Sequence, residues 1–265
     1  MAMQQRTAVI SAAASGIGRV LAEGLLADGW RLFICDADPV ALADFATAHP
    51  DTLASRVDVA DPAAVAAFAE AVRAALGAGG GLDLLVNNAG IAGPVARLEE
   101  QPVDGWQRCI DVNLNGTFYL TRALIPLLRA HGAGAAVVNM SSNAGLMGCP
   151  LRGPYVASKW ALIGLTKTLA MELGPAGIRV NALCPGSVEG PRIDRVIAAD
   201  AATRGIPDAD VRREYQRQSS LRSFARAEDI LAMVRFLASE AGARISGQAL
   251  AIDGHTETLS MELED

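Results

Sequence analysis

The sequence predicts an α/β fold built on one doubly wound parallel sheet of about seven strands, with helices on both faces. Short apolar runs alternate along the chain with segments of helical length, and most of these runs lack the polar alternation of a half-exposed strand. Strands buried on both faces are typical of a parallel sheet. The 265 residues are 51% hydrophobic and 20% charged, which is typical of a globular chain and excludes a disordered one.

Each element is supported by its own sequence pattern. The strands are expected in apolar runs at residues 7–11, 31–35, 53–57, 82–86, 135–140, 179–183 and 249–252. The helices are expected between them at residues 18–28, 39–49, 62–76, 103–130, 155–173 and 228–239. Asp61 followed by Pro62 is typical of a helix start, and Pro175 with Gly177 ends the fifth helix. The alternation predicts βαβ units with right-handed connections.

The chain shows no linker and no repeat, so residues 1–265 are expected to form a single domain. One region does not fit the alternation of strands and helices. Residues from about 187 to 226 are polar and rich in arginine, and we expect them to form an inserted helical lobe beside the substrate.

Composition and charge exclude several classes of function. The net charge is −6 and the pI is about 5.2, without a basic stripe, so neither nucleic acid nor a membrane surface is an expected partner. The first apolar run follows a short polar start, and the longest uncharged stretch, 132–151, contains asparagine, serine and proline. We therefore expect a cytoplasmic protein. The four cysteines form no C-x-x-C pair and the three histidines are scattered, so no metal site is expected.

The loop after the first strand carries the sequence SAAASGIG at 11–18, directly before a helix. A loop of small residues brings backbone N–H groups and a helix N-terminus close to an anion. Gly16 and Gly18 permit close approach of the backbone and tight packing of helix on strand. The alternative is an ordinary turn between strand and helix, which also favours glycine and serine.

Acidic residues follow the second and third strands. Asp36 lies 18 residues after Gly18, where a carboxylate can accept both ribose hydroxyls of an adenosine and would repel a 2′-phosphate. This position favours NAD over NADP. The alternative is a capping or turn role, because Asp38 and Pro39 are nearby. Asp58, with Val59, could flank the adenine, although its spacing alone indicates only a loop residue.

A tyrosine and a lysine stand four residues apart at the start of a helical segment. The spacing places Tyr155 and Lys159 on one helix face. A nearby ammonium favours the phenolate, so Tyr155 could remove a hydroxyl proton from an alcohol or protonate the alkoxide in the reverse reaction. Ser142 could hold the substrate oxygen, with Ser141 as an immediate rival. The alternative is a surface lysine beside a core tyrosine.

These motifs together resemble the short-chain dehydrogenase/reductase family, over residues 7–254. The shared motifs, in order, are SAAASGIG at 11–18, Asp36, DV at 58–59, NNAG at 87–90, VNLNGTF at 112–118, NMSS at 139–142, YVASK at 155–159, NALCPG at 181–186 and ISGQALAIDG at 245–254. The resemblance implies a Rossmann fold, a nicotinamide cofactor and oxidoreductase activity, with assembly into a homotetramer or homodimer through the helices at 103–130 and 155–173.

The resemblance also implies a role for each matching residue. Tyr155 would be the catalytic acid/base, Lys159 would bind the nicotinamide ribose and lower the Tyr155 pKa, and Ser142 would orient the substrate. Asn113 would hold a water that relays protons from Lys159. The implied cofactor-binding residues are Ser15, Gly16, Ile17, Gly18, Asp36, Asp58, Val59, Asn88, Gly90, Tyr155, Lys159, Pro185, Gly186 and Val188. Among them, Asn88 and Gly90 would border the adenosine, and 185–188 would face the nicotinamide; Asn87 would tie strands together.

Three positions depart from the family pattern. Ala12 replaces a glycine of the loop, and a positive φ there would cost on the order of 1 kcal/mol. Gly190 replaces a threonine, so one hydroxyl contact to the nicotinamide amide is expected to be missing. His255 replaces a second glycine near the end, and we expect it to be exposed.

The most favoured function is an NAD-dependent oxidoreductase that transfers hydride between nicotinamide and a secondary alcohol or ketone. Alternatives are an NADPH-dependent reductase of 3-oxoacyl thioesters and a non-enzymatic cofactor-binding regulator. Lys159 and the glycine loop argue against a lyase of the halohydrin type. The substrate itself stays open: Arg152 or Arg192 could meet an anionic group, Glu189 could bind sugar hydroxyls, and the arginines of 187–226 could simply be a solvated surface.

Overall fold

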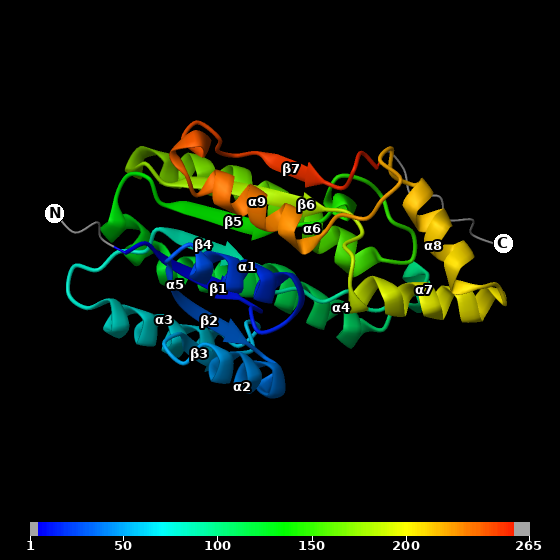
Figure 1. Ribbon diagram of the computed structural model, residues 1–265, viewed down its shortest axis with the longest axis horizontal. Coiled ribbons are helices and arrows are strands. Elements are labelled where there is room, and N and C mark those ends of the chain that lie inside the picture. Colours follow the sequence, from blue (N-terminus) through cyan, green and yellow to red (C-terminus); the bar gives the residue numbers. More distant parts are fainter. Residues whose placement is uncertain (1–4, 257–265) are drawn as a thin grey trace.

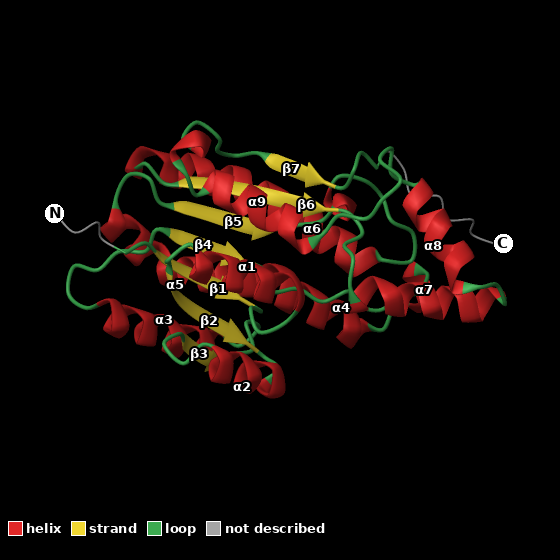
Figure 2. Ribbon diagram, viewed as in Figure 1, coloured by secondary structure: helices red, strands yellow, loops and turns green. Residues whose placement is uncertain are grey.

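The computed structural model describes residues 5–256, which form one parallel sheet covered by helices (Figures 1 and 2). The strand order is β3-β2-β1-β4-β5-β6-β7, and every pairing is parallel. The strands are β1 Thr7–Ser11, β2 Arg31–Asp36, β3 Leu53–Arg56, β4 Leu84–Asn87, β5 Ala136–Met140, β6 Arg179–Pro185 and β7 Ala249–Ile252. The predicted fold class and the seven strands are confirmed, and no strand bound is shifted by more than two residues.

The α-helices begin and end close to the expected positions. They are α1 Gly16–Ala27, α2 Pro39–Ala48, α3 Pro62–Leu76, α4 Val103–Ile110, α5 Gly116–His131, α6 Gly153–Leu173, α7 Pro191–Arg204, α8 Asp208–Arg217 and α9 Ala227–Leu237. Both α2 and α3 start with an aspartate followed by proline. Asp38 accepts hydrogen bonds from the first-turn N–H groups of α2, and Asp61 does so for α3.

Two apolar layers sandwich the sheet, and successive residues of one strand point into opposite layers. Ile10 and Ile34 pack with α1, α2 and α9, whereas Val9 and Phe33 pack with α3, α5 and α6. All four side chains are at most 1% exposed. Burial on both faces explains why the strands read as continuous apolar runs.

The last connection differs from the predicted right-handed rule. Helix α9 lies on the same face as α1, and Gly24 of α1 packs against Leu231 of α9. From β1 to β2 the chain moves toward the β3 edge of the sheet, whereas from β6 to β7 it moves toward the opposite edge. The connection through α9 therefore has the opposite hand, so the prediction is wrong there. The link is not a short βαβ unit, because residues 187–226 intervene and bring the chain to the other face.

The prediction of a single helix at 103–130 is also wrong. A five-residue π-helical segment, Asp111–Asn115, separates α4 from α5. Such segments rotate the side chains that they carry relative to a continuous α-helix, and they are common at functional sites. Asn113 lies at the centre of this one.

The predicted lobe contains α7 and α8 and projects beyond the carboxyl ends of the strands, on the side to which the arrowheads point (Figure 1). A small cluster of its own joins the two helices, including Ile193, Ile197 and Val211. A bridge between Val188 and Ala225 closes the base of the lobe. Within residues 5–256, we find no helix with the length and apolarity needed to cross a membrane.

Candidate active site

The site lies where the strand order changes direction, between β1 and β4. In an open parallel sheet, ligands bind in the crevice outside the carboxyl ends of the strands at this point. Ser11, the last residue of β1, accepts hydrogen bonds through Oγ from the N–H groups of Asn88 and Ala89 (3.0 and 3.1 Å). The Asn88 amide donates to the carbonyls of Ser11 and Ala12 (3.1 and 2.9 Å). These bonds attach the glycine loop to the end of β4.

The glycine loop leaves room for an anion at the start of α1. A Cβ at Gly18 would lie 2.0 Å from the Ala12 carbonyl oxygen, so only glycine permits this packing of helix on loop. Ser15 and Gly16 are exposed, and among the described residues no side chain caps α1, in contrast to α2 and α3. The uncapped N–H groups favour a phosphate-binding loop over an ordinary turn.

Ala12 stands where the family pattern has glycine. It adopts the left-handed conformation, with a φ of 50°. A non-glycine residue in this region costs about 1–2 kcal/mol. Glycine at position 12 would remove this cost, but the greater conformational entropy of the unfolded glycine chain offsets part of the gain. Ala12→Gly is therefore expected to raise the free energy of unfolding by up to about 1 kcal/mol. Urea denaturation checks this; a lower stability of the variant would contradict it.

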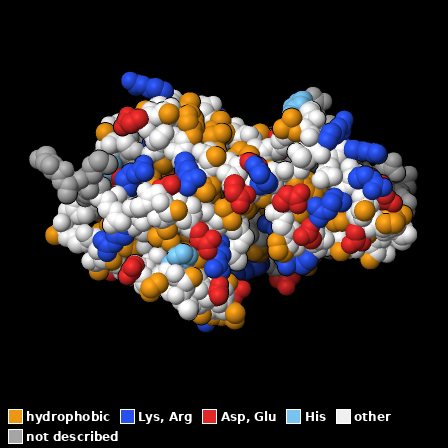
Figure 3. Space-filling model, viewed as in Figure 1, with side chains coloured by type: hydrophobic (Ala, Val, Ile, Leu, Met, Phe, Trp, Pro, Cys, Tyr) orange, Lys and Arg blue, Asp and Glu red, His pale blue; other side chains and the backbone are white. Residues whose placement is uncertain are grey.

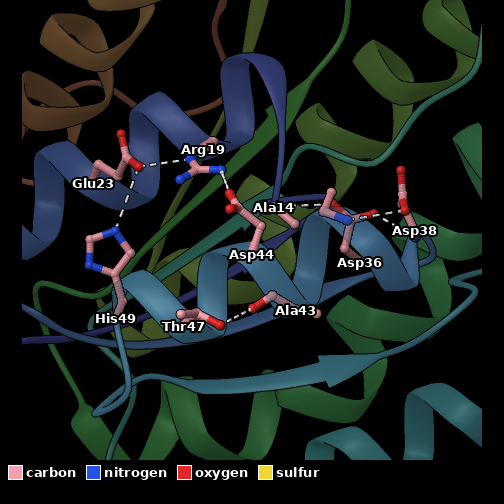
Figure 4. Close-up of polar contacts among 10 residues, drawn as sticks. Ala14, Arg19, Glu23, Asp36, Asp38, Ala43, Asp44, Thr47 and His49 are labelled. Atoms are coloured by element: carbon pink, nitrogen blue, oxygen red, sulfur yellow. Dashed lines mark hydrogen bonds and ion pairs between the residues drawn. The ribbon is translucent and has the colours of Figure 1, made fainter.

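Asp36 ends β2 with its side chain directed at the glycine loop (Figure 4). Its two carboxylate oxygens accept hydrogen bonds from the N–H groups of Ala14 and Asp38 (2.9 and 3.0 Å). The cap of α2 is Asp38, so Asp36 does not have the capping role considered as its alternative, but its bond from the Asp38 N–H two residues on gives it the turn role. Each carboxylate oxygen has a second lone pair, so two ribose hydroxyls remain acceptable partners.

The nearest basic side chain on α1 is already engaged. Arg19 forms ion pairs with Glu23 of its own helix and with Asp44 of α2, and Glu23 also faces His49 (Figure 4). This network joins the outer surfaces of α1 and α2. Because Arg19 faces two carboxylates, it is poorly placed to receive the 2′-phosphate of NADP.

Asp58 follows β3 but is held by a partner that the sequence did not indicate. Burial raises its pKa, but hydrogen bonds from Arg108 and from the Ala60 N–H outweigh this, and the pKa lies below its ordinary value. The Arg108–Asp58 distance is 2.8 Å. Val59 is buried against Gly116, at the start of α5. Asp58 and Val59 therefore join the segment after β3 to α4 and α5.

The π-helical segment places Asn113 inside the protein, with no exposed surface. Its amide accepts from the Ile91 N–H (2.8 Å) and donates to the Ile91 carbonyl and to Ser158 Oγ (both 3.0 Å). These bonds join the segment after β4 and helix α6 to the π-helical segment. Because the amide is engaged, a relay water would have to be held by the backbone of Asn113.

Lys159 is 3% exposed and donates from Nζ to the Met140 carbonyl at the end of β5 (2.7 Å). Its Nζ lies 5.6 Å from the centre of the Tyr155 ring. A Cβ on Gly90 would lie 3.2 Å from Nζ and 3.4 Å from Asn113 Oδ1. Gly90 therefore packs against the lysine and Asn113.

The environment of Tyr155 favours its phenolate. Burial alone would raise the pKa, but the charges of Lys159 and Arg192 and a hydrogen bond with Ser142 bring the pKa of the phenol below its ordinary value of 10.0. Burial lowers the pKa of the Lys159 ammonium, and the nearby Tyr155 opposes that effect. The arrangement is that of a proton acceptor with a fixed cation beside it.

The structure separates the two candidate serines. Ser141 donates its hydroxyl to the Lys159 carbonyl (2.9 Å), which fixes helix α6 to the end of β5. Ser142 instead acts on Tyr155, whose pKa it lowers, and its Oγ donates to Asn143 Oδ1 (3.2 Å). Its Oγ also accepts from the Ala144 N–H (3.2 Å). This geometry favours Ser142 as the group that faces a substrate oxygen.

The remaining candidates follow β6 and β7. A Cβ on Gly186 would lie 2.7 Å from Asp253 Cβ, so glycine is required for the close approach of these two segments. Pro185 ends β6, and Val188 begins the base of the lobe. His255 is exposed, as expected, and its Nδ1 lies 2.7 Å from Ser220 Oγ. It thus joins the end of the lobe to the segment after β7.

Several groups at the site were not indicated by the sequence. The Met140 carbonyl and Ser158 hold Lys159 and Asn113, and a backbone carbonyl or a helix serine carries no motif of its own. Asn87 does bind Asn139 across β4 and β5 (2.8 Å), as expected for a tie between strands. Within residues 5–256, no group of three histidine, cysteine, aspartate or glutamate side chains is arranged to hold a metal.

Known proteins resemble this chain along nearly its whole length. Residues 12–255 match the family model described as enoyl-(acyl carrier protein) reductase. A D-β-hydroxybutyrate dehydrogenase of Rhizobium meliloti is 33% identical, over 94% of this chain and 97% of the relative. A 2-dehydro-3-deoxy-L-rhamnonate dehydrogenase (NAD(+)) of Sphingomonas is 38% identical, over 89% and 88%. The structure of sorbitol-6-phosphate 2-dehydrogenase from Erwinia amylovora superposes with a TM-score of 0.87 at 27% identity, covering 95% of this chain and all of that one.

Proposed function

The chain belongs to the short-chain dehydrogenase/reductase family, and on this premise we propose that it is an NAD-dependent dehydrogenase of secondary alcohols, acting on a small-molecule alcohol or ketone. The observation that carries the proposal is the Tyr155 phenol beside the buried Lys159 ammonium, at the crevice where the strand order reverses. The relatives described above are named for a hydroxy acid, a sugar acid and a sugar phosphate, which share a secondary carbinol.

The residues at the crevice fit a dinucleotide. The uncapped start of α1, with Ser15, Gly16, Ile17 and Gly18, would hold the pyrophosphate, and Asp36 would accept the adenosine ribose hydroxyls. Asp58, Val59 and Asn88 would border the adenine side. Lys159, with Gly90 against it, would bind the second ribose, and Pro185, Gly186 and Val188 would face the nicotinamide. The bound cofactor would supply nicotinamide as the hydride acceptor for the carbinol carbon.

The proton moves through this chain's own groups. Ser142 Oγ would donate to the substrate oxygen and hold it beside Tyr155. The Tyr155 phenolate takes the hydroxyl proton as the hydride leaves, and in reduction the phenol returns it. Lys159 stabilises the phenolate by its charge. We propose that a water on the Asn113 backbone carries the proton onward, since Gly90 brings Asn113 and Lys159 close together.

The experiment that tests the function is a panel of secondary alcohols, polyols and hydroxy acids, offered with NAD+ or NADP+. We expect the absorbance of reduced nicotinamide to rise with at least one of these alcohols, faster with NAD+. Binding of NAD+ without reduction by any alcohol would instead favour the non-enzymatic regulator, and a preference for NADPH with 3-oxoacyl thioesters would favour the reductase alternative.

Cofactor choice gives a prediction at Asp36. Asp36→Ala removes two charge-assisted hydrogen bonds to the ribose and the charge that repels a 2′-phosphate, so the ratio of kcat/KM for NAD+ over NADP+ is expected to fall about 10- to 100-fold. Steady-state kinetics with both cofactors measure this ratio. Asp38→Ala is the matched control, because it removes the cap of α2 two residues away and should leave the ratio unchanged. An unchanged ratio in Asp36→Ala would remove Asp36 from the ribose site.

We propose that the protein is cytoplasmic and that it assembles into a homotetramer or a homodimer. Large apolar side chains are exposed along α4, α5 and α6: Val103 (84%), Phe118 (47%), Trp160 (50%) and Met171 (80%). These are the helices through which the family resemblance implies assembly, and burial of such side chains stabilises an interface.

All four cysteines are free thiols, as suits a reducing compartment.

A further inference from the structure

Several arginines of the lobe form ion pairs with acids of the same lobe. Arg204 pairs with Glu214, and Arg212 pairs with both Glu189 and Asp194. Figure 3 shows basic and acidic side chains interspersed over the lobe on one face. Such pairs are typical of a solvated surface, and Glu189 is already engaged, so it is poorly suited to bind sugar hydroxyls. Polar side chains of the interior differ, because each needs a partner inside the protein.

The Asn113 amide is the centre of a buried set of hydrogen bonds. Its Oδ1 accepts from the Ile91 N–H (2.8 Å), and its Nδ2 donates to the Ile91 carbonyl and to Ser158 Oγ (both 3.0 Å). Cys109 Sγ lies 3.4 Å from the same Nδ2. Asn113, Ser158 and Cys109 have no exposed surface. The set therefore joins four segments: the residues after β4, helix α4, the π-helical segment and helix α6.

Ser158 connects Asn113 to the turn of α6 that carries Tyr155. Its Oγ donates to the Tyr155 carbonyl (2.7 Å). A serine hydroxyl has one proton, so the lone pairs of Oγ are left to accept from Asn113 Nδ2. The direction of both hydrogen bonds is thereby fixed. Ser158 thus sets the separation between the π-helical segment and the first turn of α6.

The Asn113 amide also lies close to Lys159. A Cβ on Gly90 would be 3.4 Å from Asn113 Oδ1 and 3.2 Å from Lys159 Nζ, so the glycine lies between the two groups. Lys159 is itself held in place, because its Nζ donates to the Met140 carbonyl. A shift of Asn113 would therefore change its separation from a lysine that does not move with it.

The backbone carbonyl of Asn113 is the group to which the proposed relay water binds. Thr117 Oγ1 donates to this carbonyl (3.2 Å), and a carbonyl oxygen has two lone pairs, so one of them remains for water. The carbonyl belongs to a π-helical segment of only five residues, and the bonds of the Asn113 amide hold that segment in place. Ser158 supplies one of these bonds.

We propose that Ser158 is a positioning residue of the proton path: by accepting from Asn113 Nδ2, it holds the Asn113 carbonyl where a water can take a proton from Lys159. The inference rests on the proposed function, since only alcohol oxidation delivers a proton to Tyr155. In each turnover the carbinol proton passes to the Tyr155 oxygen. Loss of that proton toward Lys159 and the water restores the phenolate for the next turnover. Ser158 therefore acts on the recovery of the phenolate and not on the transfer of hydride.

The test separates the first turnover from the later ones. Ser158→Ala removes one oxygen atom and both of its hydrogen bonds. With an alcohol that the wild-type protein oxidises, the first turnover should form reduced nicotinamide at near the wild-type rate, because Tyr155 and Lys159 are unchanged. Steady-state kcat should fall about 10-fold, because the phenolate recovers slowly. Steady-state turnover, but not the first turnover, should become more sensitive to D2O than in the wild-type protein.

Thr166→Val is the matched control. Thr166 lies about two turns further along α6, is also completely buried, and accepts from the Asn139 amide (2.9 Å). Its loss should leave both rates unchanged. Ser158→Thr should restore most of kcat, because a helical threonine can bond the carbonyl three residues before it. A first turnover of Ser158→Ala that slows as much as the steady state, or a kcat that Thr166→Val lowers equally, would overturn the proposal.

A measurement without substrate separates this proposal from the proposed function. The Ile91 N–H donates to Asn113 Oδ1 and so reports whether the amide is held. Backbone hydrogen exchange at Ile91 and at residues 111–115 should be faster in Ser158→Ala than in the wild-type protein, and unchanged in Thr166→Val. Faster exchange there would support the positioning of Asn113 by Ser158 even if no alcohol is oxidised. Unchanged exchange would contradict it even in an active dehydrogenase.

Discussion

Tyr155→Phe is expected to lower kcat for alcohol oxidation by about 1000-fold or more while NAD+ affinity changes little. The variant keeps the ring and removes only the hydroxyl, which is the group that accepts the substrate proton. Proton transfer by a positioned side chain contributes about 10²- to 10⁴-fold to a rate. Single-turnover formation of reduced nicotinamide measures the chemical step, and fluorescence titration with NAD+ measures the binding.

The matched control is Tyr119→Phe, which removes a hydroxyl from a tyrosine on α5 that packs against the core. It should leave both quantities within about twofold. A Tyr155→Phe enzyme with a near wild-type rate would mean that another group accepts the proton. Loss of NAD+ binding equal to the loss of rate would assign Tyr155 to cofactor binding and not to proton transfer.

Lys159→Met is expected to have the second-largest effect, because it replaces the buried cation beside Tyr155 by a neutral chain of similar length. Oxidation needs the phenolate, so the rate rises as the pH passes upward through the pKa of Tyr155. The ammonium lowers this pKa. Its removal should therefore move the rising limb of the pH–rate profile to higher pH by about 1–3 units. At neutral pH the rate should fall about 100-fold or more, because little phenolate remains.

The profile distinguishes an electrostatic role from a structural one. If Lys159 served only to bind the Met140 carbonyl, its loss would lower the rate equally at every pH. Lys167→Met is the control on the same helix, where Lys167 is exposed and donates to the Gly247 carbonyl (3.2 Å). That variant should keep the wild-type profile. An unshifted profile in Lys159→Met would contradict the account of the Tyr155 pKa.

The sheet was predictable because its determinants are local. Each strand is buried on both faces and reads as an apolar run, and Asp38 and Asp61 mark their helix starts beside proline. The glycine loop and Tyr155 with Lys159 were predictable for the same reason, since spacing along one element places such groups. The structure places Lys159 against Gly90 and the Met140 carbonyl, with Asn113 and Tyr155 nearby, at the ends of β4 and β5.

What the sequence did not indicate depends on contacts between distant segments. The π-helical turn at Asn113 is stabilised by bonds to Ile91 and Ser158, which lie 22 and 45 residues away. The opposite hand of the α9 connection follows from the lobe inserted before it. Arg212 pairs with Glu189 and Asp194, which lie 23 and 18 residues away, and no spacing rule describes such pairs.

Spectroscopic titration of the Tyr155 phenol tests the central claim most directly. The chain has three tyrosines, so subtracting the ultraviolet absorbance of Tyr155→Phe from that of the wild-type protein isolates this phenol. We predict that it ionises below the ordinary pKa of 10.0, and that Lys159→Met moves the transition upward. A phenol that ionises at or above its ordinary pKa in the wild-type protein would contradict the mechanism.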